Sequence, residues 1–303
     1  MPPPSSRLRP LRASTLTRSR PTGPRLIGLV TPDLQNAIFP AITEAVGSEL
    51  TRRGFTPVLC SQSRGGGSEP AFVEFLLRRR FAGIVFTGGH YAFTDAPHAH
   101  YGQLARLSVP VTLFNAGVAH LPFPRVVCDD AAATDLGWRH LASLGHERIG
   151  LVLGPYSHLP SERKAARARE LGVDPALVVR TSFSLEAGQA VAGDLFSAGA
   201  TGLLCASDPL ALGVIRAARR RGLDVPGDVS VVGYDDSALM RCTSPPLTTV
   251  RQPVEAMAAV AVDLLCAQMD APSASAHETP LEPELIVRES TGRPRPRGAA
   301  APR

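Results

Sequence analysis

Short runs of apolar residues alternate along most of the chain with segments whose apolar residues recur every three or four positions. The first run, 26–30 (LIGLV), is apolar throughout, as expected for a strand buried on both faces of a parallel sheet. In the next segment Phe39, Ile42 and Val46 recur at helical spacing, and Gly54 ends the pattern. An alternation of strand and helix is typical of an α/β domain.

The alternation continues along the chain and divides into two similar halves. Further strands are predicted over 55–60, 83–87, 109–114, 125–128, 149–153, 178–180, 203–206, 229–232 and 284–287. Helices are predicted over 39–53, 71–80, 101–107, 131–144, 161–171, 185–196, 209–221 and 254–268. The length of 303 residues, 44% of them hydrophobic, suits about two domains. We therefore predict an α/β fold with two doubly wound parallel-sheet lobes.

One strand–helix–strand unit, 203–236, brings polar residues to the ends of its two strands. It reads LLCASDPLALGVIRAARRRGLDVPGDVSVVGYDD. Ser207 and Asp208 follow the first strand, where Asp208 is expected to cap the helix that starts at Pro209. Asp235 and Asp236 follow the second strand. Ligands of open parallel sheets bind beyond the carboxyl ends of the strands, so a ligand site is expected here.

The same unit resembles the effector-binding core of the LacI/GalR transcriptional regulators. That family reads close to A-N-D-x-x-A-L-G and then G-x-x-V-P-x-D-v-S-V-v-G-[FY]-D-D, against ASDPLALG and GLDVPGDVSVVGYDD in this chain. The segment 244–253, SPPLTTVRQP, also resembles the family. Weaker similarity extends over about residues 26–291.

The resemblance implies a bilobed, periplasmic-binding-protein-like (type I) fold whose lobes are discontinuous in sequence. Lobe one would comprise about 26–126 plus 253–268, and lobe two about 127–247 plus 280–291. A small polar effector would bind in the cleft between them, with a sugar as the first expectation and a nucleoside as the alternative. Residues 1–25 and 292–303 would be a disordered arm and a disordered tail.

The resemblance also implies ligand-binding residues in lobe two. Asp235 matches the aspartate that accepts hydrogen bonds from effector hydroxyls, and Arg163 falls at the arginine that reaches into the cleft. Phe183 matches an aromatic residue that stacks on the effector ring. Ser207 stands where the family usually has Asn. Asp236 is expected to be structural instead.

Further candidates follow strands of lobe one or lie where the chain crosses between the lobes. Asn36 falls at the asparagine that the family has in the loop after its first strand. Asn115 follows a later strand, at a position where the family commonly has Asp. Asp129 and Gln252 each follow a crossing strand. The chain shows no nucleotide-binding or catalytic motif, so no enzyme activity and no cofactor are expected.

Positive charge is concentrated at the two ends of the chain. Six of the 32 Lys and Arg lie in residues 1–25 and four in 292–303, and neither segment contains an acid. These ten arginines contribute ten positive charges, whereas the whole chain has a net charge of only +5. The residues between the two ends therefore carry a net negative charge. The family has a helix-turn-helix headpiece before the first strand, for which 1–25 leaves no room. The 303 residues are therefore expected to bind DNA weakly and without sequence preference, unless a headpiece is encoded upstream.

A metal site is not predicted. His90, Asp95, His98 and His100 lie in one loop, but without the helical spacing of metal ligands, and a rim near the cleft is the expected role. No apolar run reaches the ~18 residues of a membrane span and no secretory signal precedes 26–30, so a cytoplasmic protein with no membrane partner is expected.

The leading hypothesis is a homodimeric LacI/GalR-type regulator whose effector alters its affinity for DNA. Two alternatives share the fold: a solute-binding protein that serves a transporter, and a sensor without a headpiece that acts through partner regulators. VPGDVSVVGYDD and SPPLTTVRQP favour a regulator over a transport receptor.

Overall fold

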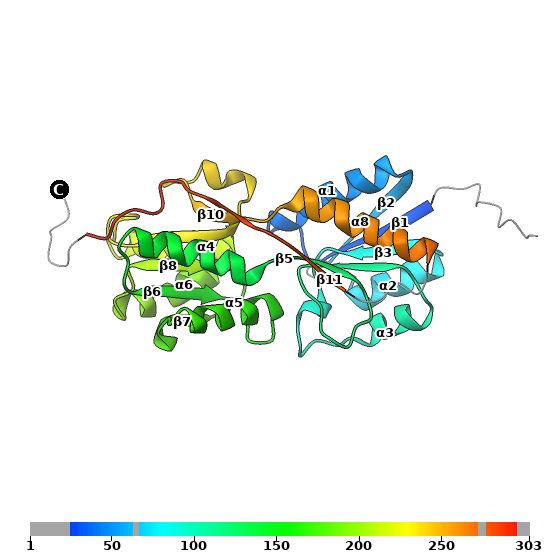
Figure 1. Ribbon diagram of the computed structural model, residues 1–303, viewed down its shortest axis with the longest axis horizontal. Helices are drawn as coiled ribbons and strands as arrows, with labels where there is room; N and C mark the ends of the chain where they lie inside the picture. Colours follow the sequence, from blue (N-terminus) through cyan, green and yellow to red (C-terminus); the bar gives the residue numbers. More distant parts are fainter. Residues whose placement is uncertain (1–24, 63–66, 272–276, 296–303) are drawn as a thin grey trace, which may run out of the picture.

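The computed structural model describes residues 25–62, 67–271 and 277–295 and has two α/β lobes side by side (Figure 1). Each lobe holds a six-stranded sheet, with strand order β11-β5-β4-β3-β1-β2 in the first lobe and β12-β10-β9-β8-β6-β7 in the second. All pairs are parallel except the antiparallel pair β10–β12. The prediction of two doubly wound lobes is confirmed.

The first lobe contains the N-terminal elements and two elements from near the C-terminus. Its strands are β1 (Arg25–Thr31), β2 (Phe55–Ser61), β3 (Gly83–Phe86), β4 (Val111–Phe114), β5 (Arg125–Cys128) and β11 (Glu278–Leu281). Its helices are α1 (Ile38–Arg52), α2 (Glu69–Arg78), η1 (His90–Ala92), α3 (Ala99–Arg106) and α8 (Val254–Asp270). The apolar stripe of α1, including Ile42 and Val46, is fully buried beside Met257 and Ala261 of α8.

The second lobe contains the central part of the chain. Its strands are β6 (Ile149–Leu153), β7 (Val178–Arg180), β8 (Gly202–Cys205), β9 (Ser230–Asp235), β10 (Thr248–Arg251) and β12 (Glu284–Ile286). Its helices are α4 (Asp130–Ser143), α5 (Leu159–Glu170), η2 (Pro175–Leu177), α6 (Leu185–Ser197), α7 (Asp208–Arg220) and η3 (Ala238–Arg241). Helices α6 and α7 pack closely because Gly213 has no side chain; a Cβ there would collide with the carbonyl oxygen of Leu185.

The chain crosses between the lobes three times: from β5 to α4, from β10 to α8 and from β11 to β12 (Figure 1). Strand β11 was not predicted, and it pairs with β5 in the first sheet. Residues 127–128 and 280–281, predicted to lie in lobe two, therefore belong to the sheet of lobe one. The segment ETPL of β11 has a proline and little apolar character, and it forms a strand only because β5 offers a free edge.

The C-terminal segment is ordered further than predicted. The backbone N–H of Gly292 donates to Ser230 Oγ at 3.0 Å, and the Arg295 guanidinium pairs with Asp224 (2.8 Å) and Asp228 (3.1 Å). The predicted disordered tail is thus wrong for residues 292–295, because acidic side chains of the second lobe hold this segment. The remaining tail, 296–303, and most of the predicted arm, 1–24, lie outside the described residues.

Candidate functional site

A cavity of about 280 Å³ is lined by residues of both lobes and by the second crossing. Its volume is near the lower limit of the roughly 300–1,000 Å³ typical of small-molecule sites. First-lobe residues of the lining are Pro32, Asp33, Asn36, Ile38, Phe39, Gln62, Thr87, Gly88, Gly89, His90, Ala92, Phe93, Phe114 and Asn115. Second-lobe residues are Asp130, His158, Pro160, Ser161, Lys164, Phe183, Ala206, Ser207, Tyr234 and Asp235, and Gln252 lies on the crossing.

Most of the predicted site residues meet in this cavity. Those that line it are Asp235, Phe183, Ser207, Asn36, Asn115 and Gln252. They come from sequence positions more than 200 residues apart, and the carboxyl ends of strands from both sheets bring them together. That they bind a ligand stays a prediction.

Asp235 ends β9 in a strained backbone conformation. Its φ of 114° is rare for a residue with a side chain, and such strain is typical of functional sites. The side chain is buried, and its Oδ1 accepts a hydrogen bond from Gln252 Nε2 at 2.7 Å. Burial and the nearby charge of Asp208 raise the pKa of Asp235 well above its usual value. The carboxyl group therefore holds its proton more tightly than an exposed aspartate would.

Asp208 is buried beside the cavity, where it bonds to Thr249 and Ser237, and it does not cap α7. Its carboxylate accepts hydrogen bonds of 2.7 Å from Thr249 Oγ1 and from the Ser237 backbone N–H. Gly233 leaves room for it, since a Cβ there would lie 2.5 Å from Asp208 Oδ1. Burial raises the pKa of Asp208 to about 6. The cap is Ser207, whose Oγ accepts from the Leu210 backbone N–H, which corrects the predicted cap.

Lys164, the single lysine of the chain, provides the positive charge of the cavity. Its ammonium group bonds to Asp130 Oδ1 and lies 4.2 Å from the centre of the Tyr234 ring. Lys164 and Asp130 are both buried. A buried lysine paired with one carboxylate and one aromatic face is well placed to hold a polar ligand group.

Two predicted residues lie outside the lining, each next to a residue that belongs to it. The Arg163 guanidinium points to Glu278 of β11 at 2.9 Å and is about one-third exposed, while its neighbour Lys164 lines the cavity. The Asp129 carboxylate caps α4 by accepting from the backbone N–H groups of Ala131 and Ala132 at 2.9 Å, while its neighbour Asp130 lines the cavity. Asp236 forms ion pairs with Arg251 and Arg288, so its predicted structural role is confirmed.

The cavity wall carries oxygen atoms that have no hydrogen-bond partner among the described residues. They are Asn36 Oδ1, Asn115 Oδ1, Asp130 Oδ2 and Gln252 Oε1, and all four are buried acceptors. Asn115 holds its position with a φ of 64°, in the left-handed region. Buried polar groups normally have partners, so a ligand that donates hydrogen bonds would complete the site.

Aromatic rings contributed by both lobes form an apolar wall. The His158 ring centre lies 4.9 Å from that of Phe93 and 4.9 Å from that of Phe183. Burial and the charges of Lys164 and Arg180 lower the pKa of His158 to about 3, so the ring is neutral at pH 7. Beside it, the Thr94 backbone N–H donates to the Ser157 carbonyl at 2.9 Å and joins the two lobes.

Sequence reasoning missed several residues of the lining, above all Lys164, Asp130, Phe93 and His158. One signal was present for Lys164, because it is the only lysine in a chain otherwise rich in arginine. For Phe93 and His158 no local signal exists, since they meet only when the lobes pack. The histidine-rich loop does lie at the cavity, through His90, and it gathers His90 and His100 around Glu69 of α2.

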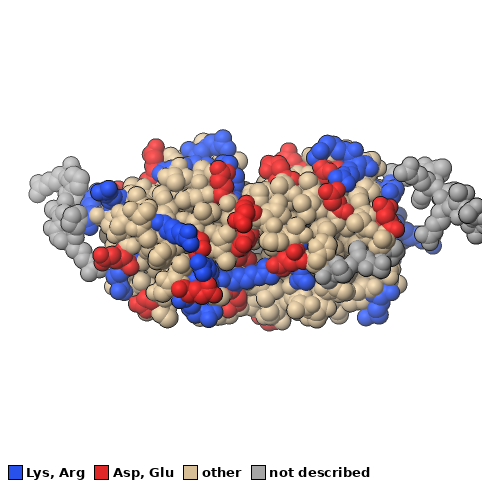
Figure 2. Space-filling view, in the orientation of Figure 1, with Lys and Arg blue, Asp and Glu red and all other residues tan. Residues whose placement is uncertain are grey.

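In the described part of the chain, no helix is both long and apolar enough to cross a membrane. On the face shown in Figure 2, acidic and basic side chains are interspersed over both lobes. The described body therefore presents no uniformly basic surface on this face.

Comparisons with known proteins agree with this architecture. A family model described as a periplasmic binding protein-like domain matches residues 138–291. An uncharacterized HTH-type transcriptional regulator from the aml 5′ region of Streptomyces limosus is 49% identical over 91% of this chain and 81% of its own length. The HTH-type transcriptional regulator MalR of Streptomyces coelicolor is 45% identical over 90% of this chain and 83% of its own. The structure of a CelR–cellobiose complex is 26% identical over 88% of this chain and 84% of that one, with a TM-score of 0.77.

Proposed function

Because the chain belongs to the LacI/GalR family of transcriptional regulators, we propose that the cavity between its lobes binds a sugar as the effector. The volume of about 280 Å³ is near the lower limit for small-molecule sites, which suits a small ligand such as a sugar. Membership of this family favours a transcriptional regulator over the alternative of a solute-binding protein that serves a transporter.

The main support for a sugar is the set of hydrogen-bond acceptors in the cavity wall that have no partner among the described residues. Asn36 Oδ1, Asn115 Oδ1, Asp130 Oδ2 and Gln252 Oε1 need donors, and a sugar offers several hydroxyl donors at short spacing. A hydroxyl group also accepts a hydrogen bond, which suits the Lys164 ammonium. An anionic ligand fits less well, because Asp130 and Asp235 both face the same space.

The aromatic wall supports a ring-shaped ligand. Phe93 and Phe183, with His158 between them, offer apolar faces against which the C–H face of a sugar ring can pack. The CelR relative was solved in complex with cellobiose, a sugar. Purine and pyrimidine rings would stack on the same wall, so a nucleoside is the competing effector class.

Effector binding would act through the arrangement of the lobes. A ligand that contacts Asn36 and Asn115 in one lobe and Asp235 in the other favours whichever arrangement places all three groups within reach. Gln252 lies on the crossing itself, so ligand contact there reaches the segment that joins the lobes. We propose that this shift changes the affinity of a homodimer for DNA, because coupling requires different effector affinity in the two states.

A ligand screen tests the proposed function. The purified chain is heated with monosaccharides, disaccharides, nucleosides and sugar phosphates, each at millimolar concentration, while unfolding is followed. A sugar present at 100 times its Kd should add about 2.7 kcal/mol to the free energy of unfolding. Stabilisation by sugars alone supports the proposal. Stabilisation by nucleosides alone, or by no neutral sugar, contradicts it.

The proposed homodimer has its own measurement. Light scattering on the eluting protein should give twice the mass of 32.0 kDa at micromolar concentration, with and without sugar. A mass of one chain under both conditions would contradict the dimer and leave the ligand assignment to the screen.

A further inference from the structure

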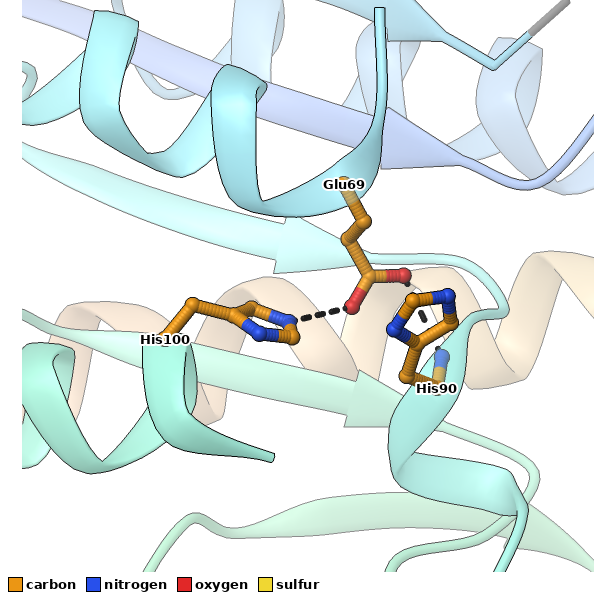
Figure 3. A group of neighbouring side chains, drawn as sticks. All are labelled: Glu69, His90 and His100. Atoms are coloured by element: carbon orange, nitrogen blue, oxygen red, sulfur yellow. Dashed lines mark hydrogen bonds and ion pairs between the residues drawn. The ribbon is translucent and has the colours of Figure 1, made fainter. Parts of the chain in front are cut away.

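Three side chains of types that bind metal ions meet in the first lobe, each from a different element (Figure 3). Glu69 begins α2, His90 begins η1 and His100 lies in the first turn of α3. One ligand atom of each lies within 4.8 Å of the other two. Two imidazoles and a carboxylate form a common donor set for zinc.

Glu69 is a fully buried carboxylate. Its Oε1 accepts from the Tyr101 hydroxyl and contacts His100 Nε2 at 2.7 Å, and its Oε2 accepts from Gln62 Nε2 and from the His90 backbone N–H, both at 3.2 Å. Within the described ranges, no lysine or arginine forms an ion pair with it, and His100 is its sole potentially cationic partner. A buried carboxylate without a full positive charge nearby is costly, and a divalent cation would supply that charge.

His90 provides an independent observation. Its Nδ1 is buried and has no hydrogen-bond partner among the described residues. Figure 3 shows the His90 ring lying against the Glu69 carboxylate, on the side away from His100. A buried imidazole nitrogen without a partner is unusual, and coordination to a metal ion would account for it.

The surroundings permit the small adjustment that a metal would need. Zinc binds nitrogen and oxygen at about 2.0–2.2 Å, so neighbouring ligands of a tetrahedral ion lie roughly 3.4 Å apart. The observed separations bracket this value, from 2.7 Å for His100 to Glu69 up to the 4.8 Å limit of the cluster. Gly89 lets the carboxylate lie close to the loop, since a Cβ at that position would collide with Glu69 Oε2.

We propose that Glu69, His90 and His100 bind one divalent transition-metal ion, best satisfied by Zn²⁺. Tyr101 would act as a positioning residue that holds Glu69 in place. The Tyr101 hydroxyl donates to Glu69 Oε1 and so orients the carboxylate toward the two histidines. Because His90 also lines the cavity, the ion would lie directly behind the wall that faces the effector.

The test uses the full chain without a histidine tag, stripped of metal by a chelator that is then removed. Zn²⁺ is titrated in competition with a chromogenic chelator, and Co²⁺ binding is followed by its visible absorption, which reports nitrogen and oxygen ligands. We expect one equivalent of Zn²⁺ per chain. His90→Asn and His100→Asn should each weaken binding by more than the roughly 10–100-fold that loss of an outer-shell partner costs.

His120→Asn is the matched control, because His120 is exposed in the same lobe and lies outside the cluster. It should bind Zn²⁺ as the parent chain does. Unfolding curves measured in the presence of chelator identify any variant that does not fold. Because His90 is partly exposed, we expect His90→Asn to fold normally. Absence of stoichiometric binding, or equal binding by the parent, His90→Asn and His100→Asn chains, would overturn the proposal.

Discussion

Gln252 Nε2 donates a hydrogen bond of 2.7 Å to Oδ1 of Asp235, with both side chains buried. Gln252 lies between β10 of the second lobe and α8 of the first, whereas Asp235 ends β9. The bond therefore ties a lobe crossing to the carboxyl group at the end of a sheet strand. A ligand that contacts either group acts at once on the cavity and on the segment that joins the lobes.

Gln252→Ala should weaken sugar binding and destabilise the chain. It removes the donor to Asp235, and the loss of a buried hydrogen bond costs about 1–3 kcal/mol. Urea unfolding and calorimetry with the sugar found in the screen measure the two effects. Gln35→Ala, in the exposed part of the loop after β1, is the control and should change neither. If the two variants had the same unfolding free energy and the same sugar affinity, Gln252 would have no role in the site.

Lys164→Met should destabilise the chain far more than Arg163→Met. Removal of Lys164 leaves buried Asp130 without its hydrogen-bonded cation and with only Arg163 Nη1 at 3.9 Å, which costs about 3–5 kcal/mol. Arg163→Met loses a partly exposed pair with Glu278 and the long contact with Asp130, together worth at most about 1 kcal/mol, because Asp130 keeps Lys164. Denaturant unfolding of both variants provides the comparison, and similar losses would refute this account of the pair.

The same two variants decide which residue contacts the effector. The resemblance assigns that contact to Arg163, whereas the cavity is lined by Lys164. Calorimetry on Arg163→Met should therefore give the parent affinity. If Arg163→Met instead lowered the sugar affinity tenfold or more, Arg163 would be the residue that contacts the effector.

Asp208→Asn should change the pH dependence of stability. The pKa of Asp208 is raised from 3.8 to about 6 in the folded chain, so the folded state holds the proton more tightly than the unfolded state. The stabilisation from this proton is complete below pH 3.8 and is lost as pH rises to about 6. Over this window the parent should lose about 3 kcal/mol relative to Asp208→Asn. A difference between the two unfolding free energies that stays constant from pH 4 to 7 would contradict the shift.

DNA binding by the 303 residues should be weak, with little sequence preference and a strong dependence on salt. Residues 1–24, which lie outside the described residues, carry five arginines and no acid, and such a segment neutralises phosphates without reading bases. The logarithm of the affinity should fall with the logarithm of salt with a slope no steeper than about −5. Titrations of operator-like and scrambled duplexes, with and without residues 1–24, measure this. Tight binding to one sequence at physiological salt would reveal a reader element.

The fold was predictable where local signals were strong. The unit from β8 to β9 follows from two apolar runs, a helix-start signal and a glycine stop. Strand β11 was not predictable, since ETPL becomes a strand only by pairing with β5, about 150 residues earlier in the sequence. The division of the lobes came from the family resemblance, because periodicity does not reveal which strands share a sheet.

The candidate site was predictable to within about one residue. Asp235 ends a strand, Ser207 and Gln252 follow strands, and strand ends are set by the sheet. The sequence favours Arg163 and Asp129, whereas their neighbours Lys164 and Asp130 line the cavity, because adjacent helical residues differ in direction by about 100°. Helix α5 begins at Leu159, two residues before its predicted start, so the facing residue could not be fixed from periodicity. The meeting of Glu69 with His90 and His100 depends on packing between distant elements.

Calorimetry of the Asp235→Ala chain with the stabilising sugar tests the central claim most directly. Asp235 is a buried carboxyl group that lines the cavity and that the resemblance assigns to effector binding. Its loss should cost about 2–4 kcal/mol of binding free energy, an affinity lower by about 30- to 1,000-fold. Asp95→Asn, an exposed acid of the nearby loop, is the control and should bind sugar as the parent chain does. Unchanged sugar affinity in a folded Asp235→Ala chain would contradict the assignment of this cavity as the effector site.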